Sequence, residues 1–304
     1  MKRAYLQLHA AVFLAGFTAI LGKLITLNEG LLVWYRLLIT VLILGMFHLW
    51  QGKLKMGLKE AFKVMGVGLI ISIHWVAFYG SVKYGNISVG VVCLSGSGFF
   101  TALLEPLLMR KRINLFELMM GILALAGIYI IFDFHPQYKT GILFGIFSAL
   151  GAAIFPIFNK QLVKVHSPRV LTFLELSGGL IMLTFILPVY LTFFPAGYFL
   201  PTASDFGWLL ILSVICTILA FELQLHSLKK ITAFTANLTY NLEPVYGIIL
   251  AFLFFGESRD FHWQFYLGLL FILMAVILQM FRVRHYTRKS HVVLIVCFIG
   301  ILGV

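Results

Sequence analysis

Charged residues are scarce in this sequence, and no long polar stretch interrupts it. Only 11% of the 304 residues are charged, while 61% are hydrophobic. A soluble domain carries roughly 25% charged residues, and a chain of this size could not hide so much apolar surface from water. The composition therefore excludes a water-soluble globular protein.

Acidic residues are rarer than basic ones, 11 against 23, which leaves a formal net charge of +12. Nucleic-acid-binding proteins also carry excess positive charge, but they gather it on one solvated face. Here the basic residues lie in short clusters between apolar runs. This pattern is typical of membrane topology signals and excludes nucleic acid as a partner.

The motifs of several enzyme classes are also missing. The sequence contains no GK[ST] of the Walker type, no HExxH, no GxSxG and no histidine-rich cluster. ATP hydrolysis by this chain is therefore not expected, nor is a cofactor or a metal. The three cysteines lie far apart within apolar runs and are interpreted as small buried hydrophobic residues: Cys93, Cys216 and Cys297.

The sequence does contain ten apolar stretches, most of about 20 residues, the length at which an α-helix crosses roughly 30 Å of hydrocarbon. Porin-type strands would alternate apolar and polar residues and are excluded. The sequence predicts an all-α integral membrane protein with ten transmembrane helices at residues 5–26, 31–50, 61–82, 87–109, 115–132, 140–159, 170–194, 206–228, 231–255 and 262–281.

The distribution of basic residues predicts the orientation. If the N-terminus is cytoplasmic, most Lys and Arg residues fall in cytoplasmic segments, as the positive-inside rule requires. Lys2 and Arg3 before the first stretch also fit a signal peptide, but the stretch is long for one, so we expect a retained helix. The prediction is a multi-pass protein of the cytoplasmic (inner) membrane with both termini in the cytoplasm.

The ten stretches fall into two sets of five. Because five is odd, tandem copies of a five-helix unit must cross the membrane in opposite directions, which is a common design of alternating-access transporters. Sequence identities between the halves are few, and the comparison rests on the order of elements. We expect a first repeat at 1–134, a second at 138–282, and a basic and then apolar tail at 283–304.

Short motifs in both halves resemble one known family. The Leu-Glu-Pro sequence at 242–244, followed by Gly-Glu at 256–257, resembles the signature in the second half of EamA-type proteins of the drug/metabolite transporter superfamily. Residues 35–37 and 82–84 resemble the first EamA repeat. The resemblance covers about residues 5–281 and implies two inverted repeats around a central cavity. The sequence departs from the family at Lys111, where Glu is common, and at Gly98, where Pro is common.

Glu243 is the strongest candidate for a site residue. A charge at bilayer depth costs about 2.5–3.5 kcal/mol, so such residues are functional candidates. Glu243 lies near the middle of the ninth stretch, and Pro244 after it frees a backbone carbonyl. The carboxyl group could bind a substrate amine or carry a coupling proton, or it could be a structural group at a proline kink. Polar neighbours included in this site are Asn237, Tyr240 and Asn241.

Arg36 and Glu175 occupy matching places in the two halves, and we expect them to lie too far apart in depth to touch. Each could anchor its own repeat or reach outward to the membrane surface. An arginine that reached the cavity would suit an anionic group such as a carboxylate.

The remaining candidates each have a functional and a structural interpretation. His74 is either a proton relay or a hydrogen-bonded packing residue, and Trp75 and Tyr79 share one helix face that could stack a substrate. Glu222 and His226 could form a proton path or a polar contact between helices. Glu105 is expected to pair with Arg110 at the membrane surface.

Together these features predict a secondary transporter that exports small metabolites such as amino acids by alternating access, with protons as a candidate coupling ion. The protein would act in the lipid bilayer as a monomer or homodimer. An alternative is an integral membrane enzyme or accessory subunit acting on lipid, which would need a cluster of His, Asp or Glu near one membrane face. A channel or receptor is a further alternative.

Overall fold

The computed structural model describes residues 2–51, 56–110, 112–134, 136–230, 239–240, 242–256 and 262–286. Within these ranges all regular elements are helices and no strand occurs. Seven helical segments are long and apolar enough to cross a membrane, and three shorter apolar helices accompany them. The prediction of an all-helical, multi-pass membrane protein is confirmed, while ten crossings in two inverted repeats stay a prediction.

Seven elements make up the first half of the chain: α1 (Lys2–Leu24), α2 (Glu29–Gln51), α3 (Leu58–Tyr84), α4 (Ile87–Leu94), α5 (Ser97–Met109), α6 (Leu115–Phe134) and the short η1 (Pro136–Tyr138). The second half contains α7 (Lys139–Leu162), α8 (Pro168–Phe193), α9 (Ala203–Ser213), the π-helix η2 (Val214–Leu219), α10 (Ala220–Leu228), α12 (Glu243–Phe255) and α13 (Trp263–Tyr286).

Two predicted stretches are not the continuous α-helices that the apolar runs indicated. The stretch at 87–109 is broken at Ser95 and Gly96, where the Ser95 hydroxyl bonds the backbone oxygen of Val92. The stretch at 206–228 contains η2, where the Thr217 hydroxyl donates to the carbonyl of Leu212 at 2.8 Å. Both breaks lie beside serine or threonine hydroxyls that bond nearby backbone groups.

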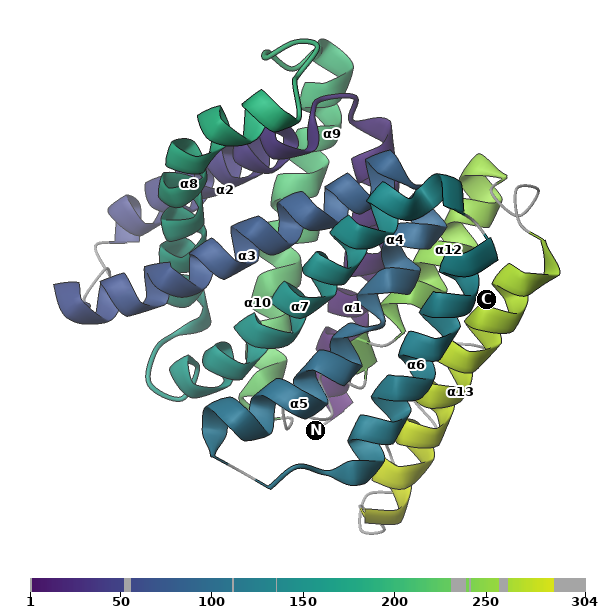
Figure 1. Ribbon diagram of the computed structural model, residues 1–304. Helices are drawn as coiled ribbons and strands as arrows, with labels where there is room; N and C mark the ends of the chain where they lie inside the picture. Colours follow the sequence, from purple (N-terminus) through teal and green to yellow (C-terminus); the bar gives the residue numbers. More distant parts are fainter. Residues whose placement is uncertain are drawn as a thin grey trace.

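The helices cross between the two halves of the chain. The long helix α3 packs along α7 and α8, α1 packs against α10 and α12, and α6 lies beside α13 (Figure 1). The connection after α1 and the connection before α9 meet at one end of the bundle, through a bond from Thr26 to Asp205. We call this the Asp205 end. At the opposite end, here called the Lys160 end, Lys160 of α7 contacts Glu105 of α5.

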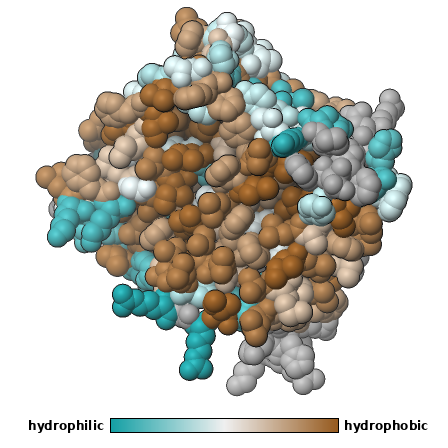
Figure 2. Space-filling view, viewed as in Figure 1, coloured by the Kyte–Doolittle hydropathy of each residue, from teal (hydrophilic) through white to brown (hydrophobic). Residues whose placement is uncertain are grey.

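Large apolar side chains cover much of the outer surface. Figure 2 shows a face that is mostly hydrophobic across its middle, with hydrophilic side chains gathered toward its margins. Exposed residues include Leu49, Phe147, Phe185 and Leu253, each more than 60% exposed. Soluble monomers rarely expose contiguous apolar surface of this extent, so lipid is the medium that this surface fits.

Glycines let α3 and α8 approach until their backbones touch. A Cβ atom at Gly68 would lie 1.7 Å from the backbone oxygen of Glu175, and one at Gly178 would lie 2.3 Å from the backbone oxygen of Met65. Membrane helices use small residues in this way because close approach increases van der Waals contact. The crossing of α3 and α8 therefore depends on the absence of side chains at these positions.

We expect Gly68→Ala to destabilise the protein by about 1–3 kcal/mol or more, because the new methyl group would push the two backbones apart. Gly66→Ala on the same helix is the matched control, since no atom lies within 4 Å of a Cβ there. Melting temperatures in detergent would measure the difference. Equal melting of the two variants would contradict this description of the crossing.

Candidate substrate cavity

A cavity of about 140 Å³ lies among helices of both halves. Aromatic side chains form much of its wall, including Trp75, Phe78, Phe155 and Phe221. Polar side chains complete the lining, among them Thr18, His74, Ser95 and Gln224. Its charged lining residues come from four helices: Arg36 of α2, Glu105 of α5, Glu117 of α6 and Glu243 of α12.

The Arg36 guanidinium is held by three hydrogen bonds. Nε donates to Thr217 Oγ1 at 2.7 Å, Nη1 donates to Tyr79 OH at 2.8 Å, and Nη2 donates to the backbone oxygen of Cys216 at 3.4 Å. Its Cζ atom lies 3.6 Å from the centre of the Trp75 ring, a cation–π arrangement that stabilises a desolvated charge. Arg36 is only 3% exposed, so it lies inside the protein and does not reach outward to the membrane surface.

The π-helix η2 explains how Arg36 is bound. Widened helical turns occur frequently at functional sites, and here η2 supplies both Thr217 Oγ1 and the Cys216 carbonyl to the guanidinium. Just before it, the Ser213 hydroxyl donates to the backbone oxygen of Arg36 at 3.2 Å. The side chain and the backbone oxygen of Arg36 are therefore both hydrogen-bonded to the second half of the chain.

Glu243 lies in the same cavity and interacts electrostatically with Arg36. Its carboxylate has no hydrogen-bond partner within the part of the chain that the structure describes. Glu243 is the first residue of α12, with Pro244 in the first helical turn. Proline is tolerated there because the first N–H groups of a helix have no acceptor within it. Glu243 therefore stands at the N-terminal end of α12, where a negative charge would be favoured by the helix dipole.

The aromatic and histidine candidates lie around this pair. Trp75 and Tyr79 share a face of α3, and both contact Arg36, while Tyr240 lines the cavity near Glu243. His74 also lines the cavity, and its Nδ1 lies 2.8 Å from the backbone oxygen of Ser148. The structure thus brings these four predicted residues close to the Arg36–Glu243 pair or onto the same wall.

Other predicted residues lie elsewhere. Glu222 accepts from Arg169 Nε at 2.6 Å and so links α10 to α8, while His226 Nδ1 lies 2.8 Å from the backbone oxygen of Glu222 within α10. Glu175 is buried outside the lining of the cavity. Asn237 and Asn241 lie outside the described residues.

The sequence analysis missed part of the lining. Glu117 and Gln224 line the cavity, as does Thr18. Glu117 was detectable as an acid inside the fifth apolar stretch, whereas Thr18 and Gln224 gave no signal among many similar residues. Glu105, expected beside Arg110, forms an ion pair of 3.5 Å with Lys160 and also lines the cavity.

A polar network closes the Asp205 end. The Asp205 carboxylate accepts from the backbone N of Thr26 at 2.7 Å, from Tyr198 OH at 2.9 Å and from Thr202 Oγ1 at 2.8 Å. Burial, together with hydrogen bonding to Asp205, raises the pKa of the Tyr198 hydroxyl, which therefore stays protonated and donates. The network joins the loop after α1 to the loop before α9.

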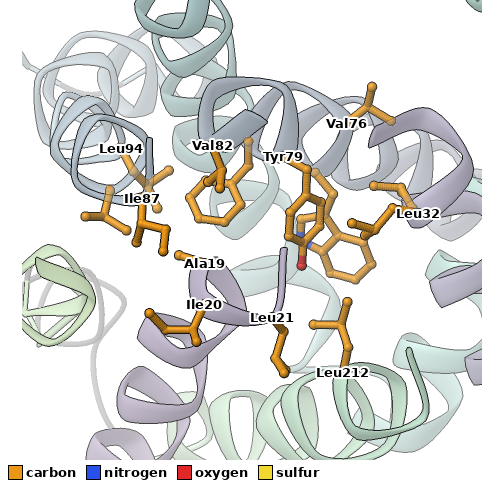
Figure 3. Packing of buried hydrophobic residues seen from close by; sticks show 14 of the residues in the cluster. Ala19, Ile20, Leu21, Leu32, Val76, Tyr79, Val82, Ile87, Leu94 and Leu212 are labelled. Atoms are coloured by element: carbon orange, nitrogen blue, oxygen red, sulfur yellow. The ribbon is translucent and has the colours of Figure 1, made fainter. Parts of the chain in front are cut away.

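Further contacts strengthen this closure. Tyr190 OH donates to Glu29 Oε1 at 2.5 Å, and Lys83 Nζ donates to the backbone oxygens of Ile25 and Leu27. Beneath them, apolar side chains of α1, α2, α3, α4 and α9 converge around Tyr79 (Figure 3). The cavity extends in the other direction, toward Glu105 and Glu117.

Removing an acceptor from Arg36 tests how strongly it is held. We expect Thr217→Val to lower the free energy of unfolding by about 1–3 kcal/mol, because a buried guanidinium N–H loses its partner. Thr192→Val is the matched control, since Thr192 is exposed and bonds only within its own helix. Unfolding measured in detergent would give the free energy of unfolding of both variants. Similar losses of stability in the two variants would argue that the hydrogen bond from Arg36 to Thr217 contributes little.

Comparison with known proteins identifies the family. The sequence pattern that defines the EamA-like transporter family matches residues 2–133 and 139–281. The chain belongs to the EamA-like transporter family. Its membership points to a membrane transporter with a small-molecule substrate, rather than to an enzyme.

Relatives of this EamA-like transporter carry the same general description. An uncharacterized transporter of Bacillus subtilis, YetK, is 26% identical over 85% of this chain and 81% of its own length. An uncharacterized transporter of Archaeoglobus fulgidus is 30% identical over 50% of this chain, and the match spans about half (52%) of that relative's length. One solved structure, described as a crystal structure of a protein, superposes on this chain with a TM-score of 0.64 at 15% sequence identity. The match covers 94% of this chain and 99% of the solved chain, and it supports the fold alone.

Proposed function

We propose that this EamA-like transporter exports amino acids or other small zwitterionic metabolites across the cytoplasmic membrane by alternating access. The observation that carries the proposal is the pairing of Arg36 and Glu243 across one aromatic-walled cavity. A substrate carboxylate would bind the guanidinium, since arginine suits planar anions. A substrate ammonium would bind the carboxylate of Glu243.

The size of the cavity favours a small substrate. Pockets that bind drug-sized molecules usually measure about 300–1,000 Å³, whereas this cavity measures about 140 Å³. Trp75 and Phe221 would flank the substrate side chain through apolar contact. An amino acid or a metabolite of similar size fits these limits better than a large drug.

The closed Asp205 end supports one state of an alternating-access cycle. With both termini in the cytoplasm, as the basic residues predict, the Asp205 end would face the outside and the cavity would open toward the cytoplasmic side. The cycle would break the Asp205 network and close the Lys160 end, using the two five-helix repeats at 1–134 and 138–282. Protons are the proposed coupling ion, and the assembly would be a monomer or homodimer.

In liposomes containing the purified protein, we expect saturable amino-acid uptake. Glu243→Gln should raise the half-saturation concentration by about 10–100-fold, because a charge-assisted hydrogen bond contributes about 1.5–3 kcal/mol. Arg36→Lys should also weaken uptake, since lysine cannot bind the substrate carboxylate with the bidentate geometry of a guanidinium. Glu222→Gln is the control outside the cavity, and wild-type transport by Glu243→Gln at every pH would reject the assigned role.

Native Cys216, which lines the cavity, can report opening at the Asp205 end. In a variant with alanine at Cys93 and Cys297, a membrane-impermeant thiol reagent is added from outside. Asp205→Ala removes several charge-assisted hydrogen bonds and should speed labelling of Cys216 by at least about tenfold. Glu60→Ala, at an exposed acid far from this network, is the control, and an unchanged labelling rate would contradict the proposed gate.

A further inference from the structure

A second ionisable site lies outside the substrate cavity, between α7 and α8. Glu175 of α8 is 0% exposed and Asn159 of α7 is 2% exposed. Asn159 Nδ2 donates to Glu175 Oε2 at 3.3 Å. Neither residue lines the cavity that contains Arg36 and Glu243.

The other two oxygens of this pair have no hydrogen-bond donor among the described residues. Glu175 Oε1 and Asn159 Oδ1 are both buried and both unpartnered, and buried polar atoms are seldom left so. As an ionised carboxylate and an amide oxygen, both atoms only accept hydrogen bonds. A single proton on Oε1 would let the carboxylic acid donate to Asn159 Oδ1 while it still accepts from Nδ2.

The surroundings of Glu175 also favour the protonated form. An ionised carboxylate without a partner is very costly in a dry interior. No ionisable side chain on α2, α3, α7, α8 or α10 interacts electrostatically with Glu175. Those side chains include Glu29, Arg36 and His48 on α2, Lys59, Glu60, Lys63, His74 and Lys83 on α3, Lys139 and Lys160 on α7, Arg169 on α8, and Glu222 and His226 on α10.

We propose that Glu175 and Asn159 form a buried proton-binding site, and that this site carries the coupling proton of the transport cycle. This inference rests on the proposed function for the coupling role, but not for the binding of the proton itself. The Glu243 carboxylate would then be left to bind the substrate amine.

The position of the site explains how a proton could control the cavity. The backbone of Glu175 lies at the close crossing with Gly68 of α3, and Asn159 belongs to α7. Proton exchange with water requires these helices to separate, because both side chains are occluded. Since α3 and α7 also line the cavity through Trp75 and Phe155, the same movement would change access to the substrate.

Glu175→Gln is the sharpest test, because glutamine can keep both hydrogen bonds to Asn159 without a titratable proton. Infrared spectra of the purified protein at neutral pH should contain the C=O stretch of a buried protonated carboxylic acid that Glu175→Gln lacks and Glu222→Gln retains. Wild-type thermal stability should fall as alkaline pH removes the proton, a fall that Glu175→Gln should not show. If the carboxylic-acid band is the same in wild type and Glu175→Gln, the proton site is rejected.

Transport then tests coupling. With the membrane potential clamped at zero, a gradient of one pH unit should drive about tenfold substrate accumulation by wild type at one proton per substrate. Glu175→Gln should abolish this accumulation but keep substrate exchange in the absence of a gradient. Wild-type accumulation by Glu175→Gln would overturn the coupling role. If wild type exchanges no amino acid, the proposed function fails and the coupling role falls with it, while the spectra still decide the proton site.

Discussion

The guanidinium of Arg36 is the group around which the rest of this protein is arranged. A cation at membrane depth is costly unless it is paired, stacked and hydrogen-bonded. Trp75 and Tyr79 of α3, together with Thr217 and the Cys216 carbonyl of η2, provide these contacts. Because the partners come from both halves of the chain, the same contacts hold the halves together at the cavity.

Close packing surrounds the cavity and limits its extent. A Cβ atom at Gly22 would lie 2.4 Å from the Tyr79 ring, so the absence of a side chain there lets the ring reach Arg36. The Asp205 end holds a polar network next to an apolar cluster, and residues from both halves of the chain contribute to each. An alternating-access cycle would exchange contacts of this kind between the two ends, because packed interfaces favour discrete arrangements over gradual deformation.

Two buried acids that look alike in the sequence have different surroundings. Glu243 lies in a cavity opposite a cation, without a hydrogen bond among the described residues, and is available to a ligand. Glu175 is enclosed by helices and paired with an amide. A substrate amine can reach the first but not the second, whereas a proton needs no such room. This difference in access is the physical reason for the proposal that Glu243 binds substrate and Glu175 binds a proton.

Several features could be predicted from the amino-acid sequence, because they depend on local composition. Apolar runs near 20 residues predicted the membrane helices, and rare charges within them drew attention to Arg36 and Glu243. The interruption at Ser95 and Gly96 was not predictable, because serine and glycine are common inside membrane helices. The π-helix η2 was missed for a related reason: hydropathy does not distinguish a widened turn from a regular one.

Composition and run length were enough to make this chain a multi-pass helical membrane protein, since hydrocarbon tolerates so apolar a chain only as helices that satisfy their own backbone groups. The folded arrangement alone decided which polar residues contact one another. Arg36 meets Thr217, and Asn159 meets Glu175, through helix crossings that no periodicity encodes. Pairings of this kind depend on how side chains of separate helices pack in three dimensions, and that packing depends on many residues at once.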